Sequence, residues 1–556
     1  MNRLLKLVTD ISSDLAWAPL FWPFVFFIPF FCLFCLRRYR PELFAGAASW
    51  VDPIYNGLAG LVLVGFLAAD LSYCLSSAFW DHNESSFGIQ SWMSWRGDAV
   101  YQNLLTEQRY SGPYGPYGYM VVGLCQGLIG PGVFATKFLP CIAGAATLGS
   151  FYLVLRRRTS ARVGLLLTSL LAALALRLGP FAFWSRPDPF LLLCVTTGLL
   201  AATRKSLANT VLLGIALGVA VNLKIDSALY FIPVAMIAIR TGFDRAALIK
   251  VATIALVAII LPFILFHQIS LGNYLGILRL VGKRNFGLLE FRLSLEWLVT
   301  LSVPLILGLR FYKRTSQDRP NEMDVNEKRY LAAIVVASVA ILIFASKRGA
   351  GPHHFLPLIP IILFFAAERR ERGRRFQWGS SMVGVTGYAL CFSWLLSCTL
   401  VAFGSAYSLS TTAIRNEAEA AAAIRDLQQL VDEHPAYTWL GGAPLGGLPV
   451  DSTFHLQLVF KGMPPGVIPP AQMDFQLAHF REVDLTRLEK EIVEKYRRPI
   501  AWVVPKGSLP VGMKTAFDQS RPLFSEKFQH EFADRFEKTG ATRFFDFYTP
   551  KAKREM

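Results

Sequence analysis

Long uncharged hydrophobic runs recur along this chain and are separated by short charged clusters. Examples are the runs at 20–36, 212–223 and 251–266. A helix needs about 20 apolar residues to cross the ~30 Å hydrocarbon core of a bilayer. A membrane β-barrel would instead show alternating strands of about 10 residues. The pattern therefore predicts an α-helical bundle that spans a membrane many times.

The hydrophobic pattern divides into about twelve membrane spans, most of them bounded by charge. The predicted ranges are 18–36, 56–76, 134–155, 163–184, 189–203, 208–223, 226–239, 248–268, 293–310, 330–346, 353–367 and 380–403. Every large cluster of Lys and Arg follows an odd-numbered span. These clusters lie at 37–40, 156–162, 204–205, 240–250, 313–329 and 369–375. Because basic residues collect in cytoplasmic loops, the N-terminus, the loops after even spans and the C-terminal region are expected on the outer side.

Three further segments complete the predicted organisation. The Gly-rich apolar segment 117–133 has no basic stop, so we expect a helix lying in the outer interface. Residues 1–16 are expected to form a short amphipathic helix. The tail from about 406 is more polar and predicts a small α/β domain. Its expected helices are 417–430, 485–496 and 525–536, and its expected strands are 437–440, 500–504 and 542–548.

The predicted fold is a polytopic α-helical membrane protein with a small C-terminal α/β extracytoplasmic domain. Residues 1–55 would hold the amphipathic helix and an additional span. Residues 56–405 would form the main membrane module, with a first outer loop at 77–133. Residues 406–556 would form the soluble domain.

Composition agrees with this organisation. The chain is 53% hydrophobic, and its net charge of +17 is explained by cytoplasmic loops without invoking nucleic acid. Nearly all of the eight cysteines lie in apolar runs, and their spacing indicates neither a zinc site nor a disulfide framework. We expect them to be small apolar packing residues.

The first outer loop begins with two carboxylates, Asp81 and Glu84. Three residues apart, they share one face if this stretch is helical. Partial desolvation at the boundary between water and lipid would raise a carboxyl pKa and make the group a better base. The alternative is a solvated helix start in which Asp81 is the N-cap.

Several basic residues lie on the predicted outer side, against the general charge rule. Charges near hydrocarbon are costly and are usually paired or functional. A convergent set of Arg, Lys and His suits a phosphate group. The set comprises Arg186, Lys224, Lys283, Arg284, Lys347, Arg348, His353 and His354. The alternative for single residues is local pairing, as between Arg186 and Asp188 or Lys224 and Asp226.

Histidine and aromatic residues add two open questions. The sequence requires no cofactor and predicts no metal site, but the pair His353–His354 together with acidic loop residues leaves a divalent cation open. Tyrosines of the first outer loop, including Tyr114 and Tyr117, fit an interfacial aromatic belt. The same rings could stack on a sugar.

Five short motifs occur in a characteristic order on the predicted outer side. The acidic pair is followed by G-x-x-x-Y at 97–101 and YGPYGY at 114–119; SRPDPFLLL lies at 185–193 and GAGPHHFLPLIP at 349–360. This order resembles the GT-C superfamily of membrane glycosyltransferases, over about residues 56–370. The resemblance is to bacterial members akin to protein O-mannosyltransferases and lipid A aminoarabinose transferases. The chain departs from the pattern in its additional span at 18–36 and in Asp98.

The resemblance implies an inverting transfer of a sugar from a polyprenyl-phosphate carrier to an acceptor hydroxyl at the outer face. Asp81 would be the general base, and Glu84 would assist it or orient the acceptor. The implied partners are the lipid-linked donor, a glycan, lipid or protein acceptor, and membrane lipid. The implied location is the bacterial cytoplasmic membrane, with the tail in the periplasm. The candidate substrate-binding residues are Arg186, Asp188, Lys224, Lys347, Arg348, His353, His354, Tyr114 and Tyr117.

Two other functions remain open from the sequence. A transporter or flippase of a phosphorylated lipid or sugar would also use charges within or near the membrane, but such proteins usually contain related halves, and no repeat is evident. A membrane anchor that presents the tail to a partner would explain the tail but not the outer basic set.

Overall fold

The computed structural model describes residues 21–39, 48–312, 325–372, 382–441, 454–468, 482–508, 511 and 524–552. The amphipathic helix expected at 1–16 lies outside these residues. A helix occupies each predicted span. These helices are α2 (Phe21–Tyr39), α3 (Ala48–Leu75), α6 (Val133–Arg156), α7 (Ala161–Arg177), α8 (Asp188–Ala202), α9 (Leu207–Leu223), α10 (Ala228–Arg240), α11 (Arg245–Leu265), α13 (Leu288–Tyr312), α14 (Val325–Ala345), α15 (Leu358–Arg372) and α16 (Met382–Glu433).

Four stretches of the described helices are long and apolar enough to cross a membrane. They are Asn56–Leu75, Val133–Arg156, Arg245–Leu265 and Val325–Ala345. No other helix is both long and apolar enough over its described residues, so the total of about twelve crossings stays a prediction.

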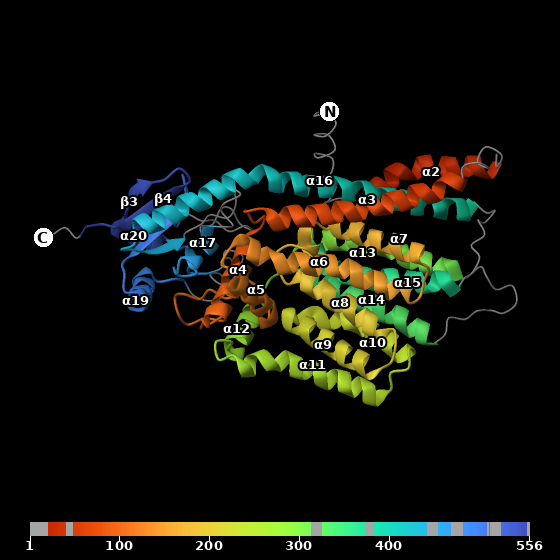
Figure 1. The fold of residues 1–556 in the computed structure, drawn as a ribbon, viewed down its shortest axis with the longest axis horizontal. Helices are drawn as coiled ribbons and strands as arrows, with labels where there is room; N and C mark the ends of the chain where they lie inside the picture. Colours follow the sequence, from red (N-terminus) through yellow and green to blue (C-terminus); the bar gives the residue numbers. More distant parts are fainter. Residues whose placement is uncertain are drawn as a thin grey trace.

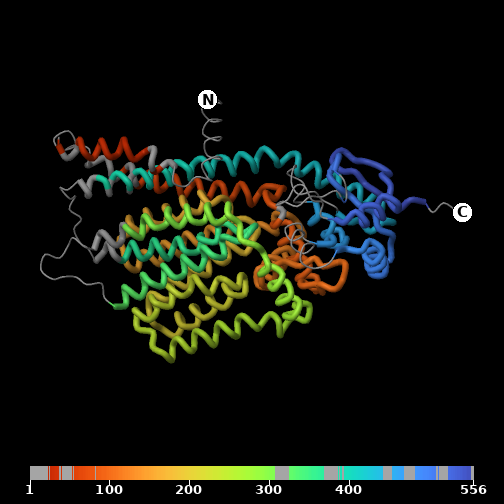
Figure 2. The backbone as a smooth tube through the Cα atoms, turned by 180° about the vertical axis from the view of Figure 1, so that it is seen from behind, coloured from red at the N-terminus to blue at the C-terminus, as the bar shows by residue number. Residues whose placement is uncertain are grey.

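The helices run side by side and form an elongated bundle (Figure 1). α3 packs against α6, α7 and α16, and α9 packs between α8 and α11. α2, the additional N-terminal helix, lies against α16 and contacts it through Phe34 and Ala389. The tail lies beyond one end of the bundle, as the view from behind also shows (Figure 2).

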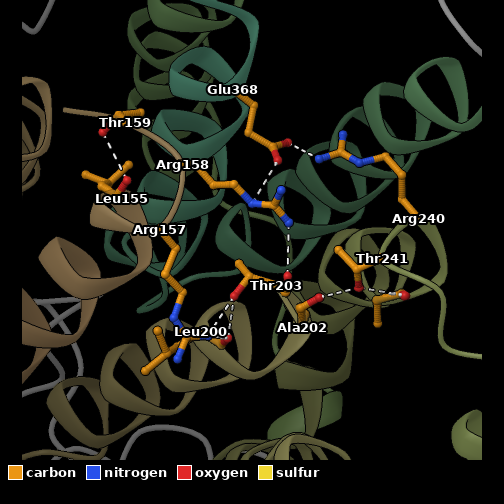
Figure 3. Close-up of polar contacts among 11 residues, drawn as sticks. Leu155, Arg157, Arg158, Thr159, Leu200, Ala202, Thr203, Arg240, Thr241 and Glu368 are labelled. Atoms are coloured by element: carbon orange, nitrogen blue, oxygen red, sulfur yellow. Dashed lines mark hydrogen bonds and ion pairs between the residues drawn. The ribbon is translucent and has the colours of Figure 1, made fainter. Parts of the chain in front are cut away.

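Basic residues from separate loops meet around Glu368 (Figure 3), where α6 and α10 end, at the end of the bundle opposite the tail (Figure 1). The buried carboxylate of Glu368 on α15 accepts a hydrogen bond from Arg240 and lies 3.9 Å from Arg158. Arg157 donates to the Leu200 carbonyl at 2.8 Å, near the end of α8. Cations at a helix C-terminus compensate carbonyls that lack a helical partner. The loops after the third, fifth, seventh and eleventh predicted spans therefore share one end, as the charge pattern requires.

The opposite end carries three short helices, α4 (His82–Arg96), α5 (Pro116–Ile129) and α12 (Leu271–Gly282). α5 matches the helix expected at 117–133, whereas α12 was not predicted. The glycines of α5 allow it to pack closely on α4. A Cβ at Gly123 would collide with the Ser91 carbonyl, and one at Gly127 with the Trp95 ring.

The helix α16 runs without a break for 52 residues. At 1.5 Å per residue it is about 78 Å long, more than twice the ~30 Å hydrocarbon core. The helix expected at 417–430 is its far end, and residue 406 lies inside it. The last span and the start of the tail are therefore one continuous element.

The tail contains a four-stranded sheet in the order β1-β2-β4-β3. The strands are β1 (Thr438–Gly441), β2 (Ile500–Pro505), β3 (Phe536–Ala541) and β4 (Phe545–Pro550). β1 and β2 are parallel, and the other pairs are antiparallel. On one face of the sheet, Trp439 and Val503 pack against α17 (Phe454–Phe460) and the C-terminal end of α16. On the other face, Leu440 and Trp502 pack against α19 (Leu485–Tyr496) and α20 (Glu526–Arg535). Helices thus cover both faces of the sheet, and β2 is buried along its whole length.

The elements expected in the tail are present, but one strand is displaced and two further elements were not predicted. The predicted strand 542–548 is displaced, because Thr542 lies in the turn and β4 begins at Phe545. β3 was not predicted: only Phe536 of this edge strand is buried, so it lacks the alternation that identifies a strand. The short buried helix α17 was also missed.

We expect Glu368→Gln to destabilise the bundle. The substitution leaves the half-buried Arg240 guanidinium without the buried carboxylate that it pairs with, and breaking such a pair costs about 3 kcal/mol. Thermal unfolding of the detergent-solubilised protein measures the effect. Glu296→Gln is the matched control, because Glu296 pairs with the exposed Arg292 at 3.2 Å and should contribute less than about 1 kcal/mol. Equal shifts in the two variants would contradict a structural role for the Glu368 pair.

Candidate active site

Four connections at the tail end of the bundle bring most of the candidate residues together. Arg186 and Asp188 lie at the start of α8, and Lys224 lies at the end of α9. Tyr114 comes from the connection between α4 and α5, and the histidine pair lies in η4 (Pro352–Phe355). These residues are far apart in the chain, and the antiparallel helices return them to the same end.

Lys224, Asp188 and Arg186 form a buried charged cluster, which we call the charge cluster. The Lys224 ammonium lies 2.7 Å from Asp188 Oδ1, and Arg186 Nε lies 3.9 Å from Asp188 Oδ2. The second distance is too long for a hydrogen bond. Arg186 Nη2 donates to the Tyr114 hydroxyl at 3.0 Å, and the guanidinium lies 4.7 Å from the Trp184 ring centre.

Both cations of the charge cluster stay charged, and one donor and one acceptor in it remain without a hydrogen-bond partner in the part of the chain that the structure describes. Burial is the largest single influence on the Lys224 ammonium and lowers its pKa, but Asp188, Tyr114 and Asp226 together outweigh burial and raise this pKa above its ordinary value. Among the described residues, Arg186 Nε and Asp188 Oδ2 have no hydrogen-bond partner although both are buried. Two cations face one carboxylate here, and unsatisfied buried groups of this kind are typical of a ligand site.

The histidines adjoin the charge cluster but have different partners. His354 Nδ1 lies 3.2 Å from Asp226 Oδ2. His353 is buried and stacks on Phe181 with ring centres 4.3 Å apart. Across the part of the chain that the structure describes, no group of three His, Cys, Asp or Glu could hold a metal ion. The histidine pair is thus divided between a polar contact with Asp226 and an aromatic stack.

Asp81 and Glu84 form a capping box at the start of α4. Asp81 is the N-cap, and its Oδ1 accepts from the Asn83 amide at 2.5 Å. Glu84 Oε1 accepts from the amides of Trp80 and Asp81, both at 2.8 Å. The alternative interpretation of Asp81 as an N-cap is therefore correct in geometry. Asp81 is nevertheless partly exposed, and it interacts electrostatically with Arg186 across the site.

Glu84, in contrast, is completely buried. Its other oxygen accepts a hydrogen bond from the Tyr73 hydroxyl, and the Lys137 ammonium lies near it. Burial raises the pKa of the Glu84 carboxyl from its ordinary value of 4.5 to about 7, although Lys137 and Tyr73 favour the charged form. Both oxygens of Glu84 are thus committed to protein partners.

Three candidates lie apart from the charge cluster. Lys347 pairs with Phe286 in an antiparallel bridge, and its ammonium donates to the Gly282 carbonyl at 3.3 Å. The neighbouring Arg348 is exposed and its amide donates to Asn285. Tyr117 donates to the Ala258 carbonyl at 2.8 Å and so faces α11. Tyr114, not Tyr117, contacts the charge cluster.

Tyr73 and Lys137 are site residues that the sequence analysis did not identify. Both are fully buried, on α3 and α6 respectively. Lys137 gave a usable signal, since an ionisable residue inside a predicted span is costly and usually functional. Tyr73 gave none, because a tyrosine near the end of an apolar run is ordinary.

A cavity of about 550 Å³ opens beside His353, between α7, α13, η4 and α16. Its walls are mostly apolar and include Leu176, Phe181, Leu293, Trp297 and Leu409. Polar groups in the lining are Arg177, Glu290, Ser405 and Ser408. The cavity therefore suits an amphipathic ligand whose polar end lies near His353.

The tail contacts the first outer loop directly. The Glu491 carboxylate on α19 accepts from the amides of Glu107 at 3.0 Å and Gln108 at 3.2 Å. In return, the Glu107 carboxylate accepts from the Asp484 amide at 3.1 Å. Leu456 of α17 packs into an apolar cluster with residues of α4. The loop that carries Tyr114 is therefore held against the tail.

Comparison by sequence finds no matching family model and no matching curated protein. Comparison of structures finds ArnT from Cupriavidus metallidurans bound to undecaprenyl phosphate, with a TM-score of 0.53 and 14% identity over 91% of this chain and 99% of ArnT. The chain shares its overall fold with ArnT. The expected resemblance is confirmed at the level of the fold.

Two other similar structures have lower scores. The Archaeoglobus fulgidus oligosaccharyltransferase has a TM-score of 0.42 and 13% identity over 80% of this chain and 69% of its own. The arabinosyltransferase EmbB from Mycobacterium smegmatis has a TM-score of 0.42 and 12% identity over 73% of this chain and 43% of its own.

The raised Glu84 pKa predicts a pH dependence of stability. The folded protein binds this proton more tightly than the unfolded chain does, so the stabilisation is complete below about pH 4.5 and is lost as the pH rises to about 7. Glu84→Gln should therefore flatten the decline in melting temperature between about pH 5 and pH 8. Glu296→Gln, which changes a half-buried carboxylate that pairs with the exposed Arg292, should leave the decline unchanged. The same decline in Glu84→Gln as in wild type would exclude this origin.

Proposed function

We propose that this protein is an integral membrane glycosyltransferase that moves a sugar from a polyprenyl-phosphate carrier to an acceptor hydroxyl, with inversion. The observation that carries the proposal is that the buried cation Arg186, which shares Asp188 with the buried Lys224, interacts electrostatically with the partly exposed carboxylate of Asp81. The fold shared with ArnT, whose structure contains undecaprenyl phosphate, supports the choice of donor.

In the proposed reaction, Asp81 accepts the proton of the acceptor hydroxyl while that oxygen bonds to the anomeric carbon. The bond from the anomeric carbon to the phosphate oxygen breaks on the opposite face, and the phosphate leaves with the electron pair. Arg186 and Lys224 stabilise the negative charge that develops on the phosphate. A positioned base contributes roughly 10²–10⁴ in rate.

The geometry favours Asp81 over Glu84 as the base. A base must reach the proton that it removes. Glu84 is buried and its oxygens bind Tyr73, Trp80 and Asp81. Glu84 is therefore assigned to holding the turn, and Asp81 to the reaction. Asp188, which compensates Lys224, would keep the cation pair from being prohibitively costly in the free enzyme.

The proposal extends to the organisation of the chain. Residues 56–405 would be the catalytic module of a bacterial cytoplasmic membrane protein, following the additional N-terminal segment 1–55. The tail, 406–556, would lie in the periplasm and support the loop at 77–133. The apolar cavity beside His353 would hold lipid, while the acceptor would approach Asp81 from the aqueous side.

Asp81→Asn is expected to reduce sugar transfer by at least 10²-fold, since it removes the base. Release of polyprenyl phosphate from a radiolabelled lipid-linked sugar by protein in nanodiscs measures the rate. Asp98→Asn is the matched control, because Asp98 lies in the same loop and pairs with Arg96 at 3.4 Å at the surface. Activity of Asp81→Asn equal to that of wild type would sink the mechanism.

Arg186→Gln is expected to weaken binding of undecaprenyl phosphate by roughly 10- to 100-fold, because a hydrogen bond to a charged group contributes about 1.5–3 kcal/mol. Arg348→Gln should change the affinity less than about twofold, since Arg348 is exposed and lies in the loop that pairs with Asn285 and Phe286, apart from the charge cluster. Quenching of intrinsic fluorescence by the lipid gives both affinities. A larger loss of affinity in Arg348→Gln than in Arg186→Gln would indicate that the phosphate binds beside Arg348 instead.

A further inference from the structure

The residues that hold the Asp81 turn form a buried network of their own. Lys137 of α6 is completely buried, and its ammonium donates to the carbonyls of Tyr73 at 3.0 Å, Ser76 at 2.8 Å and Ala78 at 2.6 Å. An ammonium has three donors, so these bonds use all of them. The carbonyls lie at the end of α3, where helical partners are missing.

This arrangement fixes the path of the chain from α3 into the first outer loop. The Lys137 ammonium also lies 4.2 Å from the centre of the Tyr73 ring and 5.3 Å from that of Phe79. The nearby Glu84 carboxylate supplies its counter-charge. A buried ammonium is tolerated only with such complete compensation. The turn between α3 and α4 thus closes around one cation.

Tyr73 links this turn to the other half of the site. Its buried hydroxyl donates to Glu84 Oε2 and accepts from the Ser185 amide at 2.8 Å. Ser185 directly precedes Arg186 in the chain. A second hydrogen bond connects the Ser185 segment to α6. The Ser185 hydroxyl donates to the carbonyl of Thr136, the residue before Lys137, at 3.2 Å.

We propose that Tyr73 and Lys137 are positioning residues that set the distance between Asp81 and the phosphate-binding Arg186. The inference rests on the proposed function. The Glu84 carboxylate binds the backbone amide of Asp81 and the hydroxyl of Tyr73. The Tyr73 hydroxyl also binds the amide of Ser185, in the segment that carries Arg186. Neither Tyr73 nor Lys137 needs to touch substrate. A displacement of about 1 Å between reacting groups costs roughly 10²-fold in rate, so this link acts on turnover more than on binding.

Tyr73→Phe tests the link because it removes only the hydroxyl. In nanodiscs, we expect the turnover with saturating lipid-linked donor to fall at least tenfold, while the affinity for undecaprenyl phosphate stays within threefold of wild type. Tyr330→Phe is the matched control. Tyr330 is equally buried, and its hydroxyl donates to the Ile361 carbonyl over a distance of 3.2 Å. This hydrogen bond lies outside the candidate site. Wild-type turnover in Tyr73→Phe would overturn the proposal, as would an equal loss in Tyr330→Phe.

A double-mutant cycle with Glu84→Gln separates positioning from general loss of folding. Both substitutions alter the same link, so their effects on turnover should be strongly non-additive. Additive effects would show that the hydroxyl acts by another route. If Tyr73→Phe does not fold, Glu84→Gln alone must lower turnover without weakening lipid binding, and wild-type turnover in that variant overturns the inference.

Failure of this inference can be distinguished from failure of the proposed function. An inactive Asp81→Asn together with a fully active Tyr73→Phe rejects only the positioning role. An active Asp81→Asn rejects the proposed base whatever Tyr73→Phe does. A cryo-EM structure of Tyr73→Phe checks the geometry without any transfer assay: the turn at 80–84 should shift relative to Ser185, and an unchanged turn would overturn the proposal.

Discussion

The Lys224 ammonium and the Asp188 carboxylate, 2.7 Å apart and almost wholly buried, join the end of α9 to the start of α8. Removing either charge would leave the other uncompensated where water is scarce. Arg186 adds a second cation to the same carboxylate, and Asp226 pairs with His354 on the adjoining turn. The need to compensate these charges sets how the helix ends meet, and thus the shape of the site.

The membrane helices could be predicted from the sequence because the cost of crossing a bilayer is paid locally, within each run of residues. The meeting of the basic loops at one end of the bundle could be predicted from the local clusters of charge. The links across the site could not. Lys137 finds its carbonyl partners about sixty positions away in the chain, at Tyr73 and Ser76. No local pattern specifies such a pairing, and the exposed edge strand β3 likewise lacked a local signal.

In the candidate site, too, the sequence predicted which residues share one end of the bundle but not which of them lie close together. Sidedness placed Lys347 and Arg348 in one set with Arg186 and Lys224, but a shared side of the membrane does not specify a distance. The structure separates the two pairs. Spacing alone also left Asp81 and Glu84 equivalent. Burial distinguishes them, because Glu84 is enclosed by the chain segments that it ties together while Asp81 stays accessible.

The unbroken helix α16 makes the last span and the tail mechanically continuous. Its 52 residues contain no proline, and Glu417 on it accepts from the Ser77 hydroxyl at 2.6 Å, beside the turn that precedes Asp81. A stiff rod anchored in the bilayer responds to lipid thickness by tilting. Tilt of α16 would therefore swing the sheet of the tail against the first outer loop, so that the composition of the surrounding lipid becomes an input to the geometry of the site.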